Sequence, residues 1–185
     1  MKKIYFLHGY RTSGKKFLCI KNFYKDSAEF LPICWDWDEY MNVPEFLDEK
    51  KKILKEDFGE KILMADSMGA NLAWNLLNEF PNLYYVMTNP VFCAEQIREQ
   101  EKILPEMRSK IFSATAETIK NKNIRLVISK FDEILDPYHY KKIFGASIKV
   151  LELEDEHKII NMKEHMPLIH KLIADVFEKS KGICL

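Results

Sequence analysis

Three side chains capable of acyl-transfer chemistry follow three separate apolar runs of the chain. Ser67 comes after the run 61–65, Asp132 lies three residues beyond the run 124–129, and His157 follows the last run. A serine hydroxyl is a weak nucleophile, but a histidine can take its proton, and a carboxylate can orient the histidine ring. The order Ser, Asp, His along the chain therefore predicts nucleophilic catalysis by these three residues.

The stretch around Ser67 reads as a strand that turns sharply into a helix. Residues 61–65 are an apolar run of strand length, and apolar residues recur at helical spacing over 70–80. A turn of this kind holds its central serine in a strained conformation and lifts the hydroxyl clear of the sheet. The usual pattern is G-x-S-x-G, in which Gly69 is kept and Ala65 replaces the first glycine. On this stretch alone, a helix N-cap at Ser67 explains the pattern equally well.

The acid and base roles each have competitors in the sequence. Asp136 precedes Pro137 and a helical run, so a helix N-cap suffices to explain it, and Asp132 is the better candidate for the acid. His157 is the only histidine in a loop after the last predicted strand. The other four lie beside a glycine turn or in predicted helices: His8, His139, His165 and His170.

An oxyanion formed at Ser67 requires backbone N–H donors close to the hydroxyl. Met68 directly follows the serine at the predicted start of a helix, and its amide is one candidate donor. Tyr10 lies in the loop after the first predicted strand and is the second candidate. Gly9 precedes it, and a glycine there allows the backbone to come close to a ligand.

Predicted strands and helices alternate along the whole chain. Because the strands are continuous apolar runs, the pattern indicates a parallel sheet covered by helices on both faces, with sites at the carboxyl ends of the strands. Phe58 and Leu168 are predicted to lie on the buried sides of their helices. The predicted strands are 4–7, 30–37, 61–65, 83–88, 124–129 and 147–153, and the predicted helices are 16–24, 44–58, 70–80, 137–144 and 167–177.

The composition excludes several classes of function. The chain has 185 residues, 28 of them basic and 28 acidic, so no excess of positive charge points to nucleic acid as a partner. No apolar stretch is long enough to span a membrane, and the cytoplasm is the expected location. The four cysteines are scattered, without a pair spaced for zinc or a disulfide framework, and we expect no metal and no cofactor.

One rival pattern suggests a nucleotide. Residues 9–15 match G-x-x-x-x-G-K after a strand, the phosphate-binding loop of nucleotide hydrolases, and Asp66 resembles the magnesium-associated aspartate at the end of a second strand. The residue after the lysine should be Ser or Thr, which would bind magnesium, but it is Lys16. This alternative also leaves Ser67 and His157 without a role.

Five short motifs occur along the chain in a known order. They are YFLHGYRTS at 5–13, DSMG at 66–69, TNPV at 88–91, FDEILD at 131–136 and EH at 156–157. In these motifs the chain resembles the YqiA/YcfP-like esterases, a group of small α/β-hydrolases. The resemblance implies a cytoplasmic hydrolase of carboxylic esters or acyl thioesters, without metal or cofactor, and it again places the acid at Asp132.

We therefore expect one α/β-hydrolase domain over residues 1–185, with a mostly parallel sheet of about six strands. The segment 91–122 is the expected lid. The substrate is expected to be a small acyl ester or thioester, free or bound to a carrier protein, and the candidate substrate-binding residues are Arg11, Phe92 and Arg98. A third possibility, beside the esterase and the nucleotide hydrolase, is a catalytically silent binding module that keeps this fold.

Overall fold

The computed structural model describes residues 1–12 and 14–181. Six strands form one sheet in the order β2-β1-β3-β4-β5-β6, and every neighbouring pair is parallel. This confirms the predicted parallel α/β architecture. The strands are β1 (Lys2–Leu7), β2 (Phe30–Trp35), β3 (Lys61–Asp66), β4 (Tyr84–Thr88), β5 (Ile124–Ser129) and β6 (Lys149–Leu153).

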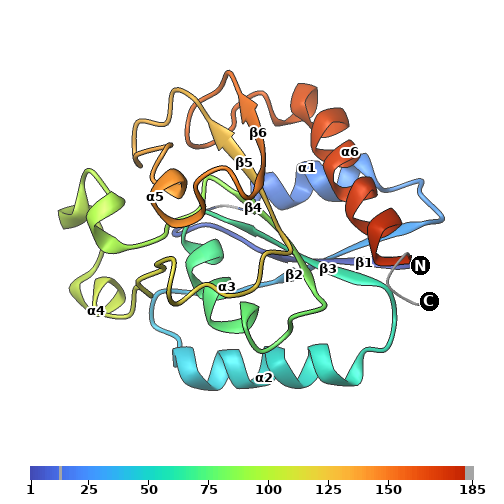
Figure 1. Ribbon diagram of the computed structural model, residues 1–185, viewed down its shortest axis with the longest axis horizontal. Coiled ribbons are helices and arrows are strands. Elements are labelled where there is room, and N and C mark those ends of the chain that lie inside the picture. The colour runs from blue at the N-terminus through green and yellow to red at the C-terminus, as the bar shows by residue number, and fades with distance from the viewer. Residues whose placement is uncertain (13, 182–185) are drawn as a thin grey trace.

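Helices cover both faces of the sheet. Figure 1 shows α2 and α3 on one side and α1 and α6 on the other, and the members of each pair contact each other. Parallel strands need such crossover helices, so the two apolar layers follow from the connectivity. The helices are α1 (Lys15–Phe23), α2 (Val43–Glu56), α3 (Met68–Leu77), α4 (Pro105–Arg108), α5 (Tyr140–Phe144) and α6 (Met162–Lys181), with short 3-10 turns η1 (Ala94–Gln96) and η2 (Gln100–Lys102).

The alternation of side chains along β3 divides the core into two clusters. Leu63 and Ala65 pack into the cluster under α2 and α3, where Trp74 is the largest fully buried side chain. Ile62 and Met64 point to the opposite face and pack into the cluster that α1 and α6 complete. Since β3 is buried on both faces, it has the continuous apolar sequence that marks it as a central strand.

The strand register brings the carboxyl ends of the strands to one edge of the sheet. Leu7 at the end of β1 lies opposite Ala65, and Asp66 at the end of β3 lies opposite Thr88. Ser129 at the end of β5 lies opposite Leu153 of β6. The loops that carry the candidate site residues therefore leave the sheet on the same side.

Two sequence expectations about buried helix faces are wrong. Helix α2 ends at Glu56, so Phe58 lies beyond it and is 96% exposed. Helix α6 begins at Met162, five residues before the start predicted at Pro167, and the proline lies inside the helix. With this earlier start, residues such as Ile169 face the core, and Leu168 is 44% exposed.

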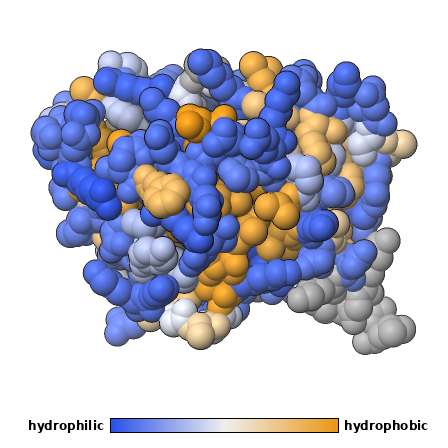
Figure 2. Space-filling view, turned by 90° about the horizontal axis from the view of Figure 1, so that it is seen from above, coloured by the Kyte–Doolittle hydropathy of each residue, from blue (hydrophilic) through white to orange (hydrophobic). Residues whose placement is uncertain are grey.

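One face of the molecule is mostly hydrophilic. Figure 2 shows charged and polar side chains over most of the face seen from above, with hydrophobic side chains gathered in a band near its middle. Within the described part of the chain, no helix has the length and apolar character needed to cross a membrane.

Candidate active site

Ser67 occupies a strained turn between β3 and α3. Its backbone has φ 50° and ψ −116°, a region that residues other than glycine rarely enter. The Ser67 amide donates to Thr88 O at 2.9 Å, and the Ser67 carbonyl accepts from Val91 N at 3.1 Å. These bonds to the end of β4 hold the turn, so the hydroxyl projects from the edge of the sheet.

Gly69 allows α3 to approach the end of β1. An added Cβ at this position would lie 2.3 Å from the carbonyl oxygen of His8 and 2.6 Å from that of Leu7. Both neighbours are backbone atoms that cannot turn away, so a glycine is required here. The close approach brings the loop after β1, including Gly9, alongside Ser67. Ala65 lies in extended β3 and is fully buried, and its methyl group fits where the usual motif has glycine.

The three side chains singled out in the sequence meet at this edge. Ser67 Oγ lies 2.9 Å from His157 Nε2, and His157 Nδ1 lies 2.7 Å from Asp132 Oδ2. The second oxygen of Asp132 accepts the amides of Ile134 and Leu135 at 2.9 and 2.7 Å. The carboxylate is almost fully buried and the imidazole is 12% exposed, so the relay is largely shielded from water.

The loop that carries His157 is held by two residues to which the sequence analysis gave no role. Asn89 donates through Nδ2 to the carbonyl of His157 at 2.8 Å and to Ser129 Oγ at 2.9 Å. Glu133 accepts the His157 amide at 3.0 Å. Asn89 has a positive φ of 41° at the end of β4. The Asn-Pro pair after a predicted strand was the available signal, because asparagine tolerates this conformation.

Two acidic residues before His157, Glu154 and Asp155, have partners of their own. Asp155 is buried and accepts the amides of Glu156, Ile160 and Asn161, which orders the approach to α6. Burial alone would raise the pKa of Asp155, but these amide bonds hold the pKa below its ordinary value. Glu154 pairs with Lys130 across 3.3 Å.

The competing residues make contacts with groups other than Ser67. Asp136 accepts the amide of Tyr138 at 3.1 Å in the turn before α5, which starts at Tyr140 rather than at Pro137. The four other histidines contact the following groups: His8 Nε2 accepts from Trp37 N, His139 lies 3.6 Å from Cys93 Sγ, His165 lies 3.1 Å from Asp155, and His170 lies 3.0 Å from Tyr24 Oη. Burial lowers the pKa of His139, and Lys142 adds to this effect.

The candidate oxyanion donors belong to the residue after Ser67 and to a loop that passes close to it. Met68 is the first residue of α3, where an amide has no partner within the helix. Tyr10 follows Gly9, and an added Cβ at Gly9 would lie only 3.3 Å from Ser67 Cβ. The phenol oxygen of Tyr10 also accepts the amide of Leu104 at 3.3 Å, which joins this loop to the segment 91–122.

A cavity of about 730 Å³ opens at Ser67 and His157. Arg11 lines it and pairs with Glu39 across 2.7 Å. The described residues that line the cavity do not include the other two candidate substrate-binding residues, Arg98 and Phe92. Arg98 is exposed, and Phe92 stacks on Trp74 in the core. The apolar side chains of the wall include Met68, Val91, Ile97, Ile103, Ile134 and Leu135, and also Ile159, Ile160 and Met162.

The segment 91–122 supplies one wall of this cavity and is anchored to α3. Asn71 donates to the carbonyls of Val91 and Phe112 and accepts the Phe112 amide, so one side chain fastens both parts of the segment. Trp74 Nε1 donates to the same Val91 carbonyl at 2.8 Å. Pro105 is the first residue of the short α4, a position that proline favours.

The residues of the rival nucleotide pattern are not arranged as in a magnesium-nucleotide site. Lys16 Nζ lies 2.5 Å from Asp66 Oδ1, so the residue at the expected magnesium-ligand position pairs with the expected magnesium-associated aspartate. No group of three or more His, Cys, Asp or Glu side chains that could hold a metal ion occurs in residues 1–12 and 14–181. Cys19, Cys34 and Cys93 are free thiols, and Cys184 lies outside the described residues.

Solved structures with the same arrangement place this architecture among known folds. The ydeN gene product of B. subtilis aligns over 96% of this chain and 100% of its own with a TM-score of 0.73 and 16% identity. The chain has the α/β-hydrolase fold. Human thioesterase 2 aligns over 97% of both chains (TM-score 0.60, 12% identity), and the Paleococcus ferrophilus monoacylglycerol lipase over 96% and 94% (TM-score 0.66, 16% identity).

The similarity to known proteins is found in the structure and not in the sequence. Neither the protein-family models nor the curated protein sequences gave a match to the chain. The structural neighbours are YdeN-like proteins and other members of the α/β-hydrolase superfamily at low identity, which supports the wider fold. The resemblance to the YqiA/YcfP-like esterases in particular stays a prediction.

Proposed function

We propose that the protein is a serine hydrolase that cleaves carboxylic esters or acyl thioesters through a covalent acyl-enzyme. The observation that carries the proposal is the continuous relay from Ser67 Oγ to His157 Nε2 at 2.9 Å and from His157 Nδ1 to Asp132 at 2.7 Å. The strained backbone of Ser67 supports it, because such strain persists where it serves a function. Ser67 and His157 both line one cavity.

The proposed reaction has two steps. Ser67 Oγ attacks the acyl carbonyl as His157 Nε2 takes the hydroxyl proton, and the charged ring is stabilised by Asp132. The amides of Met68 and Tyr10 stabilise the oxyanion. Collapse of the tetrahedral intermediate breaks the bond to the alcohol or thiol, which leaves with the proton from His157. Water then attacks the acyl carbon as His157 takes its proton, and the bond to Ser67 Oγ breaks as His157 returns the proton to this oxygen, which releases the acid.

The cavity supports an apolar acyl group. Its walls near Ser67 are formed largely by aliphatic side chains from α3, from the segment 91–122 and from the loop after Asp132, such as Met68, Ile103 and Leu135. A cavity of about 730 Å³ falls in the range that suits small-molecule ligands. The segment 91–122 would act as the lid over this group. Structural neighbours described as a thioesterase and a monoacylglycerol lipase agree with this substrate class.

The experiment compares Ser67→Ala with Ser109→Ala. Ser109 is exposed on the segment 91–122 and donates to Glu106 O, so its loss should leave turnover within about twofold. Ser67→Ala should lower kcat for p-nitrophenyl esters by about 10³-fold or more and abolish labelling by a fluorophosphonate probe, with the fold intact. Unlabelled wild-type protein without ester turnover would instead favour the silent binding module. Magnesium-dependent ATP turnover lost in Lys15→Ala would favour the nucleotide alternative.

A further inference from the structure

A buried carboxylate lies beside the proposed oxyanion site. Asp66 is the last residue of β3, directly before Ser67, and is only 4% exposed. The point that a Cβ on Gly9 would occupy is 3.1 Å from Asp66 Oδ2 and 3.3 Å from Ser67 Cβ. Because Gly9 precedes Tyr10, the carboxylate, the nucleophile and a proposed oxyanion donor share one small region.

An uncompensated charge at Asp66 would oppose the reaction proposed above. The tetrahedral intermediate places negative charge on an oxygen next to Ser67, and like charges a few ångströms apart repel more strongly in a site that excludes water. A carboxylate here works against the donors that the oxyanion needs. The proposed mechanism therefore requires that the charge of Asp66 be cancelled locally.

Lys16 supplies the compensating charge. Its ammonium lies 2.5 Å from Asp66 Oδ1, and the two side chains are 12% and 5% exposed. Thr88 Oγ1 donates to the same oxygen at 2.6 Å, which fixes the carboxylate. Both Lys16 and Asp66 line the cavity at Ser67.

Two other cations of the cavity wall, Arg11 and Lys102, pair with carboxylates other than Asp66. Arg11 pairs with Glu39 across 2.7 Å, and Lys102 pairs with Glu99 across 2.5 Å. Lys16, on the first turn of α1, is the cation in contact with Asp66. This also accounts for the second lysine after the glycine-rich loop, which the nucleotide alternative left unexplained.

We propose that Lys16 is a positioning residue that acts through Asp66, neutralising this carboxylate so that the oxyanion can form beside it. The inference rests on the proposed hydrolase function. The Lys16–Asp66 pair is expected to affect the transition state more than substrate binding, because the charge of Asp66 matters most when the oxyanion develops.

The test is a double-mutant cycle of Lys16→Met, Asp66→Asn and the double variant, with Lys21→Met on the same helix as the control. Rates are expressed per active site titrated with the fluorophosphonate. Lys16→Met should lower kcat for p-nitrophenyl esters about 10- to 100-fold while KM changes less than about threefold. Adding Asp66→Asn should recover about tenfold or more of this loss, Lys16→Arg should retain most of the rate, and Lys21→Met should match the wild type.

Each other outcome has a defined meaning. A double variant as slow as Lys16→Met would overturn the inference, because Lys16 would then act independently of Asp66. The same holds if Lys16→Met keeps the wild-type kcat per titrated site and only lowers the titrated fraction, which would indicate a structural role. Wild-type protein without esterase activity would contradict the proposed function itself, and with it this inference.

Discussion

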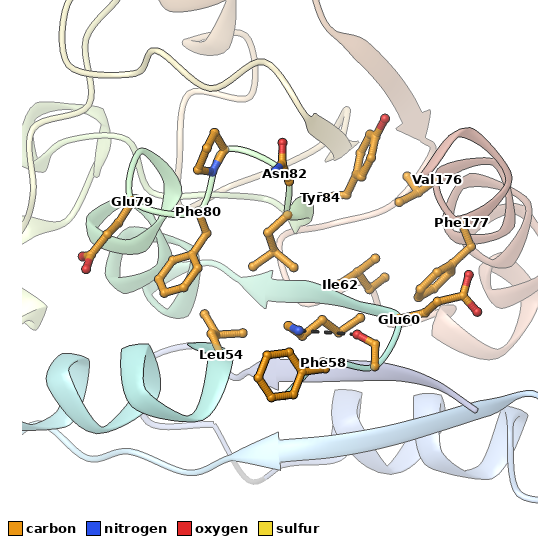
Figure 3. A pocket seen from close by; sticks show the side chains of 14 residues that line it. Leu54, Phe58, Glu60, Ile62, Glu79, Phe80, Asn82, Tyr84, Val176 and Phe177 are labelled. Atoms are coloured by element: carbon orange, nitrogen blue, oxygen red, sulfur yellow. Dashed lines mark hydrogen bonds between the residues drawn. The ribbon is translucent and has the colours of Figure 1, made fainter. Parts of the chain in front are cut away.

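Two cavities of almost equal volume lie at opposite edges of the sheet. The cavity at Ser67 measures about 730 Å³ and lies at the carboxyl ends of the strands. The other measures about 720 Å³ and lies at the amino ends of β3 and β4, where Ile62, Tyr84 and the exposed Phe58 line it. Figure 3 shows this second cavity between the end of α2 and the C-terminal half of α6.

The difference between these cavities lies in how their polar groups are arranged. At the carboxyl edge, polar side chains from separate loops converge on one hydroxyl, and the backbone at Ser67 is strained. In the cavity at the amino edge, the lining residue Lys61 donates to the backbone carbonyls of Asp57 and Gly59, not to another lining side chain. Volume alone is therefore a poor guide to a site, and convergent polar groups are a better one.

The largest loss of activity is expected at the carboxyl edge, from a change of Asp132, the proposed acid of the triad. Asp132→Asn should lower kcat about 10³- to 10⁴-fold, because the amide no longer stabilises the charged ring of His157. Asp136→Asn is the matched control four residues away and should stay within about threefold. Steady-state kinetics with p-nitrophenyl esters measure both, and a similar loss in the two variants would contradict the assignment of the acid.

A second comparison uses one glycine from each edge. Gly69→Ala should reduce the free energy of unfolding by about 3 kcal/mol, since its Cβ would meet two backbone carbonyls at 2.3 and 2.6 Å. The Cβ of Gly59→Ala at the amino edge would meet side-chain atoms, Asp57 Oδ1 at 3.2 Å and Lys3 Nζ at 3.9 Å, and the change should cost less than about 1 kcal/mol. Urea denaturation measures both, and equal costs would remove the special role of Gly69.

A pH effect is expected at the amino edge. Burial alone would raise the pKa of Asp57, but hydrogen bonds from Lys3 and Tyr5 lower it from 3.8 to about 2. A lowered pKa stabilises the fold above pH 3.8, and this stabilisation is lost as the pH falls through 2. Asp57→Asn should therefore cost about 2 kcal/mol at neutral pH, and its difference from wild type should shrink between about pH 4 and pH 2.

Glu60→Gln is the control for this pH effect, because Glu60 is an exposed carboxylate on the same loop. Its free energy of unfolding should stay within about 0.5 kcal/mol of the wild type at each pH. Chemical denaturation across the pH series gives the measurement. A difference between Asp57→Asn and wild type that is independent of pH would rule out ionisation of Asp57 as its cause.

The smallest effect is expected from Phe58→Ala. Phe58 is 96% exposed and lines only the amino-edge cavity, so both kcat and stability should stay close to wild type, within about twofold and 0.5 kcal/mol. Thermal unfolding and ester turnover check this. A tenfold loss of turnover would show that the two edges communicate and would break the comparison.

The sequence was most informative where local pattern and tertiary packing agree. The strand and helix alternation predicted the parallel sheet, and β5 was predicted with the bounds 124–129 that the structure has. The predicted start of α6 was wrong because Asp155, a residue of the preceding loop, accepts backbone amides and orders the chain ahead of Pro167. The role of Asn89 was missed because its partners, Ser129 and His157, are 40 and 68 residues away.

The contact between Tyr10 and Leu104 has a consequence for how a substrate would enter. Tyr10 is the proposed second oxyanion donor, and its phenol oxygen accepts the amide of Leu104 in the segment that walls the cavity. A displacement of this segment would change that hydrogen bond, so it would also act on the residue that carries the proposed oxyanion donor. Admission of an acyl chain and the positioning of this amide would thus be linked through one side chain.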